Sequence, residues 1–124
     1  MRTASSLIPA LALIVGATAP AYAAQPDATT LGRWCSQYQR TVDGAVLEPN
    51  EAIEAASCLA YVRGVVDAQY SYTQHGGRRP WCLPDGGVRL DEVTALVAGE
   101  PVNPGVSMIE FLDAALTGAY PCQR

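Results

Sequence analysis

Four cysteines constrain the fold of this 124-residue chain more than any other feature: Cys35, Cys58, Cys82 and Cys122. In a short exported chain this number predicts two disulfides, for which three pairings are open. If Cys35 and Cys58 lie on adjacent antiparallel helices they can meet, which leaves Cys82 for Cys122. Each loop closure is worth about 3–4 kcal/mol in the chain-entropy model. Two such closures would supply much of the stability of a small domain.

The first residues have the pattern of an export signal. A lone cation, Arg2, precedes the apolar run from Leu7 to Val15, and Ala21-Tyr22-Ala23 is the small-x-small pattern that a signal peptidase cuts. We therefore expect a signal peptide over 1–23, cleaved after Ala23, and a mobile polar leader over 24–29. The apolar run is too short for a permanent membrane span, so membrane insertion is not expected.

Charge and composition exclude several classes of protein. All eight cations are arginine, against 12 carboxylates, for a formal net charge of −4. Nucleic acid is not expected as a partner, because phosphate backbones require clustered cations. The acidic character suits a basic protein partner or serves solubility alone. With a single histidine and no Cys-x-x-Cys motif, we predict no metal, no cofactor and no redox site.

The longest helical pattern runs from Asn50, the expected N-cap, to about Tyr72 or Gln74. A recurrence at three- and four-residue steps places one set of side chains on a single face: Cys58, Tyr61, Val62, Val65 and Tyr72. Gly64 interrupts this pattern at a cost of about 1 kcal/mol relative to alanine. We therefore predict that another helix approaches closely at Gly64.

Three further helices follow from periodicity and capping signals. Thr30 is expected to cap a first helix that ends near Val42. A third helix, starting after Gly87, is expected to end at Gly99. Ser107 and Glu110 form a capping box at the start of a fourth. The prediction is a compact all-α domain over 30–124, with four helices linked by two disulfides, in which Tyr61, Gly64 and Leu116 pack helices together.

Arg78, Arg79 and Trp81 form the strongest candidate for a partner-binding site. Arginine and tryptophan are enriched at binding hot spots, and Pro80 would stiffen the loop that carries them. Two interpretations are open: the loop presents all three side chains, or Trp81 packs beneath the fold while the arginines are solvated. The connection over 100–105 is another exposed candidate, although a simple helix linker is favoured there.

No residues suggest catalysis. His75 lacks a nucleophile and an orienting partner if every cysteine is oxidised. Two carboxylate pairs, Glu51 with Glu54 and Asp91 with Glu92, open helices, where the helix dipole explains them. We therefore expect no enzyme activity.

Taken in order, several motifs resemble the Rap/Tai immunity-protein family, the periplasmic antidotes to type VI secretion effectors. The motifs are Cys58-x-x-Tyr61-x-x-Gly64, Trp81-Cys82-x-Pro84, a helix ending near Pro101, and Ala114-Ala115-Leu116-x-x-Ala119-Tyr120-Pro121-Cys122. The last run is similar to the family's closing signature, with tyrosine in place of phenylalanine. The third helix departs from the pattern, because it lacks the family's usual glutamine and aromatic positions.

The resemblance implies a disulfide-linked helical domain in the periplasm that is often dimeric. It implies a protein that binds a secreted peptidoglycan amidase effector and blocks its active-site groove, without catalysis of its own. The alternative from another class is a small periplasmic acid-stress chaperone with no toxin partner. Behaviour at low pH separates the two, because such a chaperone loosens in acid and exposes apolar surface.

Overall fold

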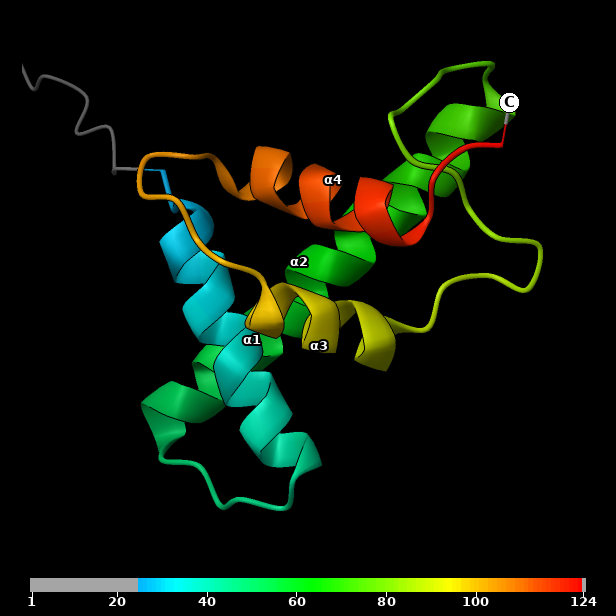
Figure 1. The fold of residues 1–124 in the computed structure, drawn as a ribbon. Coiled ribbons are helices and arrows are strands. Elements are labelled where there is room, and N and C mark those ends of the chain that lie inside the picture. The colour runs from blue at the N-terminus through cyan, green and yellow to red at the C-terminus, as the bar shows by residue number, and fades with distance from the viewer. Residues whose placement is uncertain (1–24, 124) are drawn as a thin grey trace, which may run out of the picture.

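The structure, a computed structural model, describes residues 25–123 and contains four helices in that range. They are α1 (Ala28–Val42), α2 (Pro49–Gln74), α3 (Leu90–Gly99) and α4 (Met108–Ala119), as Figure 1 shows. Residues 25–123 include no strand, only two isolated bridges, Asp27 to Ser107 and Trp81 to Pro121. The prediction of an all-α, four-helix domain is confirmed.

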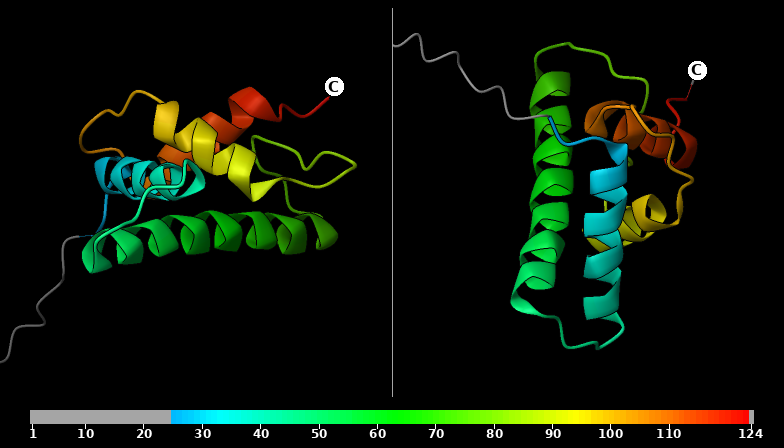
Figure 2. Two further views of the ribbon diagram at one scale, coloured as in Figure 1. Left: turned by 90° about the horizontal axis from the view of Figure 1, so that it is seen from below. Right: turned by 90° about the vertical axis from the view of Figure 1, so that its left-hand side faces the viewer.

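The long helix α2 forms one layer, and the other three helices pack against one side of it. In Figure 2, α1 runs antiparallel beside α2, while α3 and α4 cross above. Helix α1 contacts each of the other three helices and lies between α2 and the pair formed by α3 and α4. The opposite side of α2 is left to solvent.

The N-caps of α1 and α2 differ from the residues predicted to cap these helices. Helix α1 begins at Ala28, and Asp27 caps it by accepting a hydrogen bond from the Thr30 backbone N–H at 3.0 Å. Ala28 donates its own N–H to the Val106 carbonyl at 2.9 Å. This long-range bond starts the helix two residues before the predicted cap, Thr30, so the end of the expected 24–29 leader belongs to the folded domain.

At α2 the cap is Glu48 rather than Asn50. Pro49 occupies the first helical position, where its fixed φ suits a helix and its missing N–H costs nothing. The Glu51 Oε2 atom accepts the Glu48 backbone N–H at 2.9 Å. The helix ends at Gln74, as predicted.

The core-facing stripe of α2 is formed by Cys58, Val62, Val65 and Gln69, all buried. Tyr72 is instead 47% exposed, so it does not continue the predicted face. The prediction for Gly64 is wrong: it is exposed, and a Cβ built there would meet no atom within 4 Å. Two other predicted packing residues do contact the core, since Leu116 is fully buried and Tyr61 packs against the core while half-buried.

Both disulfides have the predicted pairing. Cys35–Cys58 joins α1 to α2 across a Cα–Cα distance of 5.0 Å. Cys82–Cys122 joins the segment after α2 to the tail after α4, with Cα atoms 4.8 Å apart. All four cysteines are therefore paired.

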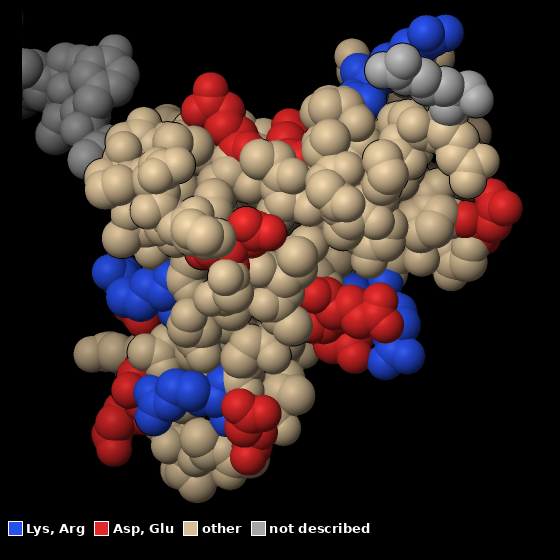
Figure 3. Space-filling model, viewed as in Figure 1, with Lys and Arg blue, Asp and Glu red and all other residues tan. Residues whose placement is uncertain are grey.

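On the face shown in Figure 3, arginines and carboxylates lie together at the lower left and on the right, carboxylates lie alone near the top, and uncharged side chains cover most of the rest. None of the four helices combines the length and the apolar character that a bilayer crossing requires, as far as residues 25–123 are concerned. Within the same range, no cluster of histidine, cysteine, aspartate and glutamate is large enough to hold a metal ion.

Candidate protein-binding loop

The candidate loop, residues 75–81, reverses the chain at the end of α2. His75 is the C-cap of α2, and Gly76 takes a φ of 76°, a value that residues other than glycine rarely adopt. The next residue, Gly77, donates its N–H to the Tyr72 carbonyl at 3.0 Å. The Tyr72 ring lies so close to Gly77 that a Cβ there would collide with it. The loop therefore begins as a tight, backbone-bonded turn.

Trp81 closes the loop from inside the protein. Its side chain is 0% exposed, and its indole N–H donates to Asp113 Oδ1 on α4 at 2.9 Å. Its carbonyl accepts the Gln69 Nε2–H at 3.0 Å. This corrects the interpretation that Trp81 is presented to a partner: it anchors the loop.

Arg79 also contacts the body of the protein. Its guanidinium lies 3.3 Å from Asp113 Oδ1, and only 26% of its side chain is exposed. The same guanidinium lies 5.8 Å from the centre of the Tyr72 ring, a cation–π distance. Arg79 thus ties the loop to both α2 and α4, and only part of it can reach a partner.

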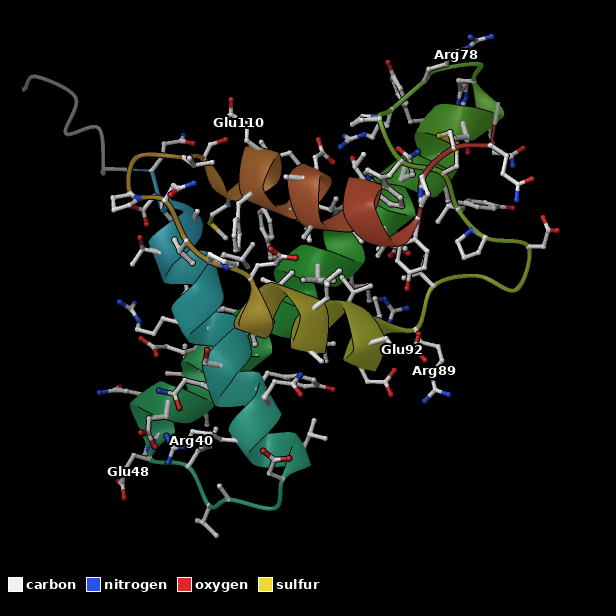
Figure 4. All side chains as sticks on the ribbon, in the orientation of Figure 1. Arg40, Glu48, Arg78, Arg89, Glu92 and Glu110 are labelled. Carbon is white, nitrogen blue, oxygen red and sulfur yellow. A yellow bond between two sulfur atoms is a disulfide. The ribbon has the colours of Figure 1, made fainter. Side chains whose placement is uncertain are left out.

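Arg78 is the exposed cation of the loop. It makes no ion pair with any residue in the described range, and Figure 4 shows it pointing away from the body of the protein. Of the three side chains predicted to bind a partner, Arg78 alone is fully presented. The loop places it on a rigid base, because the residues on both sides are held.

The following backbone strengthens that base. Cys82 donates its N–H to the Tyr120 carbonyl at 2.9 Å, and its sulfur is bonded to Cys122. Trp81 and Pro121 form an isolated bridge beside it. The loop is therefore fixed to the C-terminal tail as well as to α2 and α4.

Two anchoring residues escaped the sequence-based prediction, Asp113 and Gln69. Asp113 receives two hydrogen bonds from a loop more than 30 residues earlier in the chain, which no local pattern reveals. Gln69 is different, because it continues the four- and three-residue steps of the buried stripe of α2. A polar residue at a core position of a helical pattern indicates a buried hydrogen bond, so this residue could have been predicted from the sequence. Its Oε1 is buried without a hydrogen-bond partner among residues 25–123.

The 100–105 connection behaves as a helix linker. Val102 and the adjoining Val106 pack against the core, and a Cβ at Gly32 of α1 would lie 3.1 Å from Val102 Cγ2. The Val106 carbonyl also accepts the N-terminal hydrogen bond of α1. The connection holds α1 in place, which supports the favoured interpretation.

Three shifted pKa values have causes in helix caps, ion pairs and burial. The pKa of Glu51 is lowered by the hydrogen bond from the Glu48 backbone, then by Arg40. The pKa of Asp91 is lowered chiefly by its hydrogen bond with Arg89. Burial raises the pKa of the Tyr61 hydroxyl, and the charge of Asp113 raises it further. His75 is exposed and contacts the Ser71 carbonyl through Nδ1 at 2.8 Å.

A comparison with protein families matches residues 27–122 to the family model of the Rap1a immunity proteins. The match covers all four helices and all four cysteines, and so includes the whole anchored loop. Searches of curated proteins and of solved structures found no match. The family match agrees with the resemblance seen in the cysteine-containing motifs, and on this basis the chain belongs to the Rap1a immunity protein family.

Proposed function

We propose that this immunity protein blocks the active-site groove of a type VI secretion peptidoglycan amidase with its 75–81 loop. Membership of the family implies inhibition of such an effector by a non-enzymatic protein. The further step, from inhibition to a particular surface, is supported by one observation: Arg78 is exposed on a loop whose other end is anchored by Trp81.

Rigidity makes this loop suitable for inhibition. A loop that is already ordered loses little conformational entropy on binding, so more of its contact energy appears as affinity. Trp81 and Arg79 converge on Asp113, and the Cys82–Cys122 disulfide holds the adjacent backbone. The loop can therefore exclude substrate by packing alone, without a reactive group.

The compartment agrees with this function. Rap1a immunity proteins are periplasmic, and two disulfides are consistent with an oxidising environment. Export through the 1–23 signal, cleaved after Ala23, belongs to the proposal, and that segment lies outside the described residues. A homodimer likewise stays a prediction.

The test is an inhibition titration of the cognate amidase on peptidoglycan, with the protein purified from the periplasm. Arg78→Ala should weaken inhibition by at least about tenfold, the loss expected for a hot-spot arginine. Arg63→Ala is the matched control, because Arg63 is another exposed arginine, in the middle of α2 and 69% accessible. Inhibition that is unchanged by Arg78→Ala, with binding retained, would move the inhibitory surface away from this loop.

A further inference from the structure

A second surface lies at the other end of α2, where α1 connects to it. Three of the large apolar side chains on the surface are here: Val42 is 57%, Val46 96% and Ile53 65% exposed. We call these three residues the hairpin patch. Exposed apolar side chains that gather in one place, rather than singly, mark interaction sites.

A hollow adjoins the hairpin patch. Its volume is about 330 Å³, and its lining is mainly small or apolar: Tyr38, Thr41, Ala45, Leu47, Ala52, Ala55 and Ala56. Each residue of the patch is next in sequence to a lining residue. The hollow has room for a side chain of leucine size, and a partner's side chain seated in it would lie close to the patch residues that adjoin the lining along the chain.

The turn that shapes the hollow is preformed. Gly44 takes a φ of 85°, and its N–H donates to the Thr41 carbonyl at 3.0 Å. The flanking residues, Asp43 and Ala45, donate to carbonyls of α1, each at 2.9 Å. A partner would therefore meet a surface that is already ordered, which lowers the entropic cost of docking.

The rim of the hairpin patch is negative. The nearby cations are already paired, Arg40 with Glu51 at 2.8 Å and Arg33 with Glu54 at 3.0 Å. Asp43 and Glu48 are exposed and make no ion pair within residues 25–123. Figure 4 shows Glu48 and Arg40 beside this connection. The unpaired charge at the rim is therefore anionic.

This charge selects between occupants. A second copy of the chain, docked about a two-fold axis, would bring the same carboxylates toward their own counterparts. Like charges brought together across an interface cost several kcal/mol by general experience. A partner that surrounds an apolar side chain with cations would instead satisfy both the hollow and the rim.

We propose that the hairpin patch docks a protein segment carrying an apolar side chain flanked by lysine or arginine. This surface is separate from the 75–81 loop: about 20 residues of α2 divide Ile53 from Gln74, or about 30 Å at 1.5 Å per residue. The proposal is independent of the inhibitory role of the loop, so either can fail without the other.

The test uses a defined probe, a blocked Lys-Leu-Lys tripeptide, titrated into isotope-labelled protein purified from the periplasm. Methyl resonances of Val42, Val46, Leu47 and Ile53 should shift with saturation, and the shifts should weaken as salt is raised. Substituting Val46→Ser and Ile53→Ser together should reduce the affinity about fivefold through lost apolar contact. Both side chains are mostly exposed, so the substitutions leave the core intact.

Two peptides and one variant serve as controls. Glu-Leu-Glu tests the charge, Lys-Gly-Lys tests the apolar side chain, and Tyr70→Ser removes another exposed side chain of α2, 61% accessible, outside the patch. Equal binding of either control peptide, or shifts confined to the 75–81 loop, would overturn the proposal. So would a dimer, seen by sedimentation, that Val46→Ser and Ile53→Ser dissociate, because a second copy would then be the occupant.

Discussion

Trp81 and Asp113, 32 positions apart in the chain, are joined by a 2.9 Å hydrogen bond from the indole Nε1–H to Oδ1. The same oxygen receives Arg79 at 3.3 Å. One carboxylate of α4 therefore holds two residues of the 75–81 loop, and the exposed Arg78 lies directly before the first of them, Arg79. Asp113 acts on the loop from within, and a partner need not touch it.

Removing this carboxylate should destabilise the protein. Asp113→Ala leaves the buried indole N–H and the guanidinium without their acceptor, and we expect the free energy of unfolding to fall by about 1–3 kcal/mol. Urea denaturation, followed by tryptophan fluorescence, measures this. Asp67→Ala is the control, because Asp67 is 70% exposed in a weak pair with Arg63 and should matter by less than about 0.5 kcal/mol.

Asp113→Asn separates charge from hydrogen bonding. Its amide oxygen can still accept from Trp81 but no longer carries the charge that holds Arg79. We expect a smaller loss of stability than with Asp113→Ala. If the two variants are equally destabilised, the charge rather than the indole bond would be the important contribution.

The two disulfides should have different effects on function. Each closes a loop, of 23 and 40 residues' separation, and removing either should cost about 3–4 kcal/mol. The pair Cys82–Cys122 adjoins the 75–81 loop, whereas Cys35–Cys58 lies between α1 and α2. Replacing Cys82 and Cys122 by alanine should therefore also weaken amidase inhibition by the folded protein.

Titrations below the unfolding transition of each variant check this prediction. Cys35→Ala with Cys58→Ala is the matched control, which should lose stability but keep the affinity of its folded fraction. Equal losses of affinity in the two double variants would mean that global loosening, not the local anchor, controls the loop.

The helices were predictable from the sequence because their information is local. Ser107 and Glu110 form the expected capping box, in which Ser107 Oγ accepts the Glu110 N–H at 3.3 Å. Two features could not be predicted because they depend on distant contacts. Helix α1 begins early because the Ala28 N–H bonds to the Val106 carbonyl, and the Trp81 side chain lies inside because Asp113 accepts its indole N–H. The loop was found by composition, but the roles of its members were set by packing.

The free energy of unfolding should fall in acid, because three carboxyl groups have lower pKa values in the folded protein than in the unfolded chain. Glu110 is held by the Ser107 hydroxyl and then by its backbone N–H, Asp91 chiefly by Arg89, and Glu51 chiefly by the Glu48 backbone. A lowered folded pKa stabilises the protein above the unfolded pKa, and this contribution is lost as the pH falls through the folded pKa. This loss of stability should begin at about pH 4.5.

Asp91 and Glu110 are exposed and 31% of the Glu51 side chain is accessible, so we expect a gradual decline in the thermal midpoint and no abrupt opening. Thermal melts from pH 7 to pH 2 measure it, together with binding of an apolar dye. A cooperative transition with strong dye binding near pH 3, accompanied by capture of unfolded proteins, would instead support the acid-stress chaperone.

Gly64→Ala tests whether the solvent side of α2 is free. Glycine in a helix interior costs about 1 kcal/mol relative to alanine, and a Cβ at Gly64 meets no atom within 4 Å. We therefore expect the free energy of unfolding to rise by about 0.5–1 kcal/mol, measured by urea denaturation. Gly32→Ala is the contrasting variant, because Gly32 is buried and its Cβ would lie 3.1 Å from Val102 Cγ2.

Both glycines lie inside helices, but the new Cβ meets Val102 at Gly32 and no atom at Gly64, so Gly32→Ala should gain less than Gly64→Ala or lose stability. Denaturation at several protein concentrations extends the test to the predicted homodimer. If Gly64→Ala destabilises the protein, and does so only at concentrations where it self-associates, then Gly64 provides close approach after all, to a second copy of α2 rather than to a helix of its own chain.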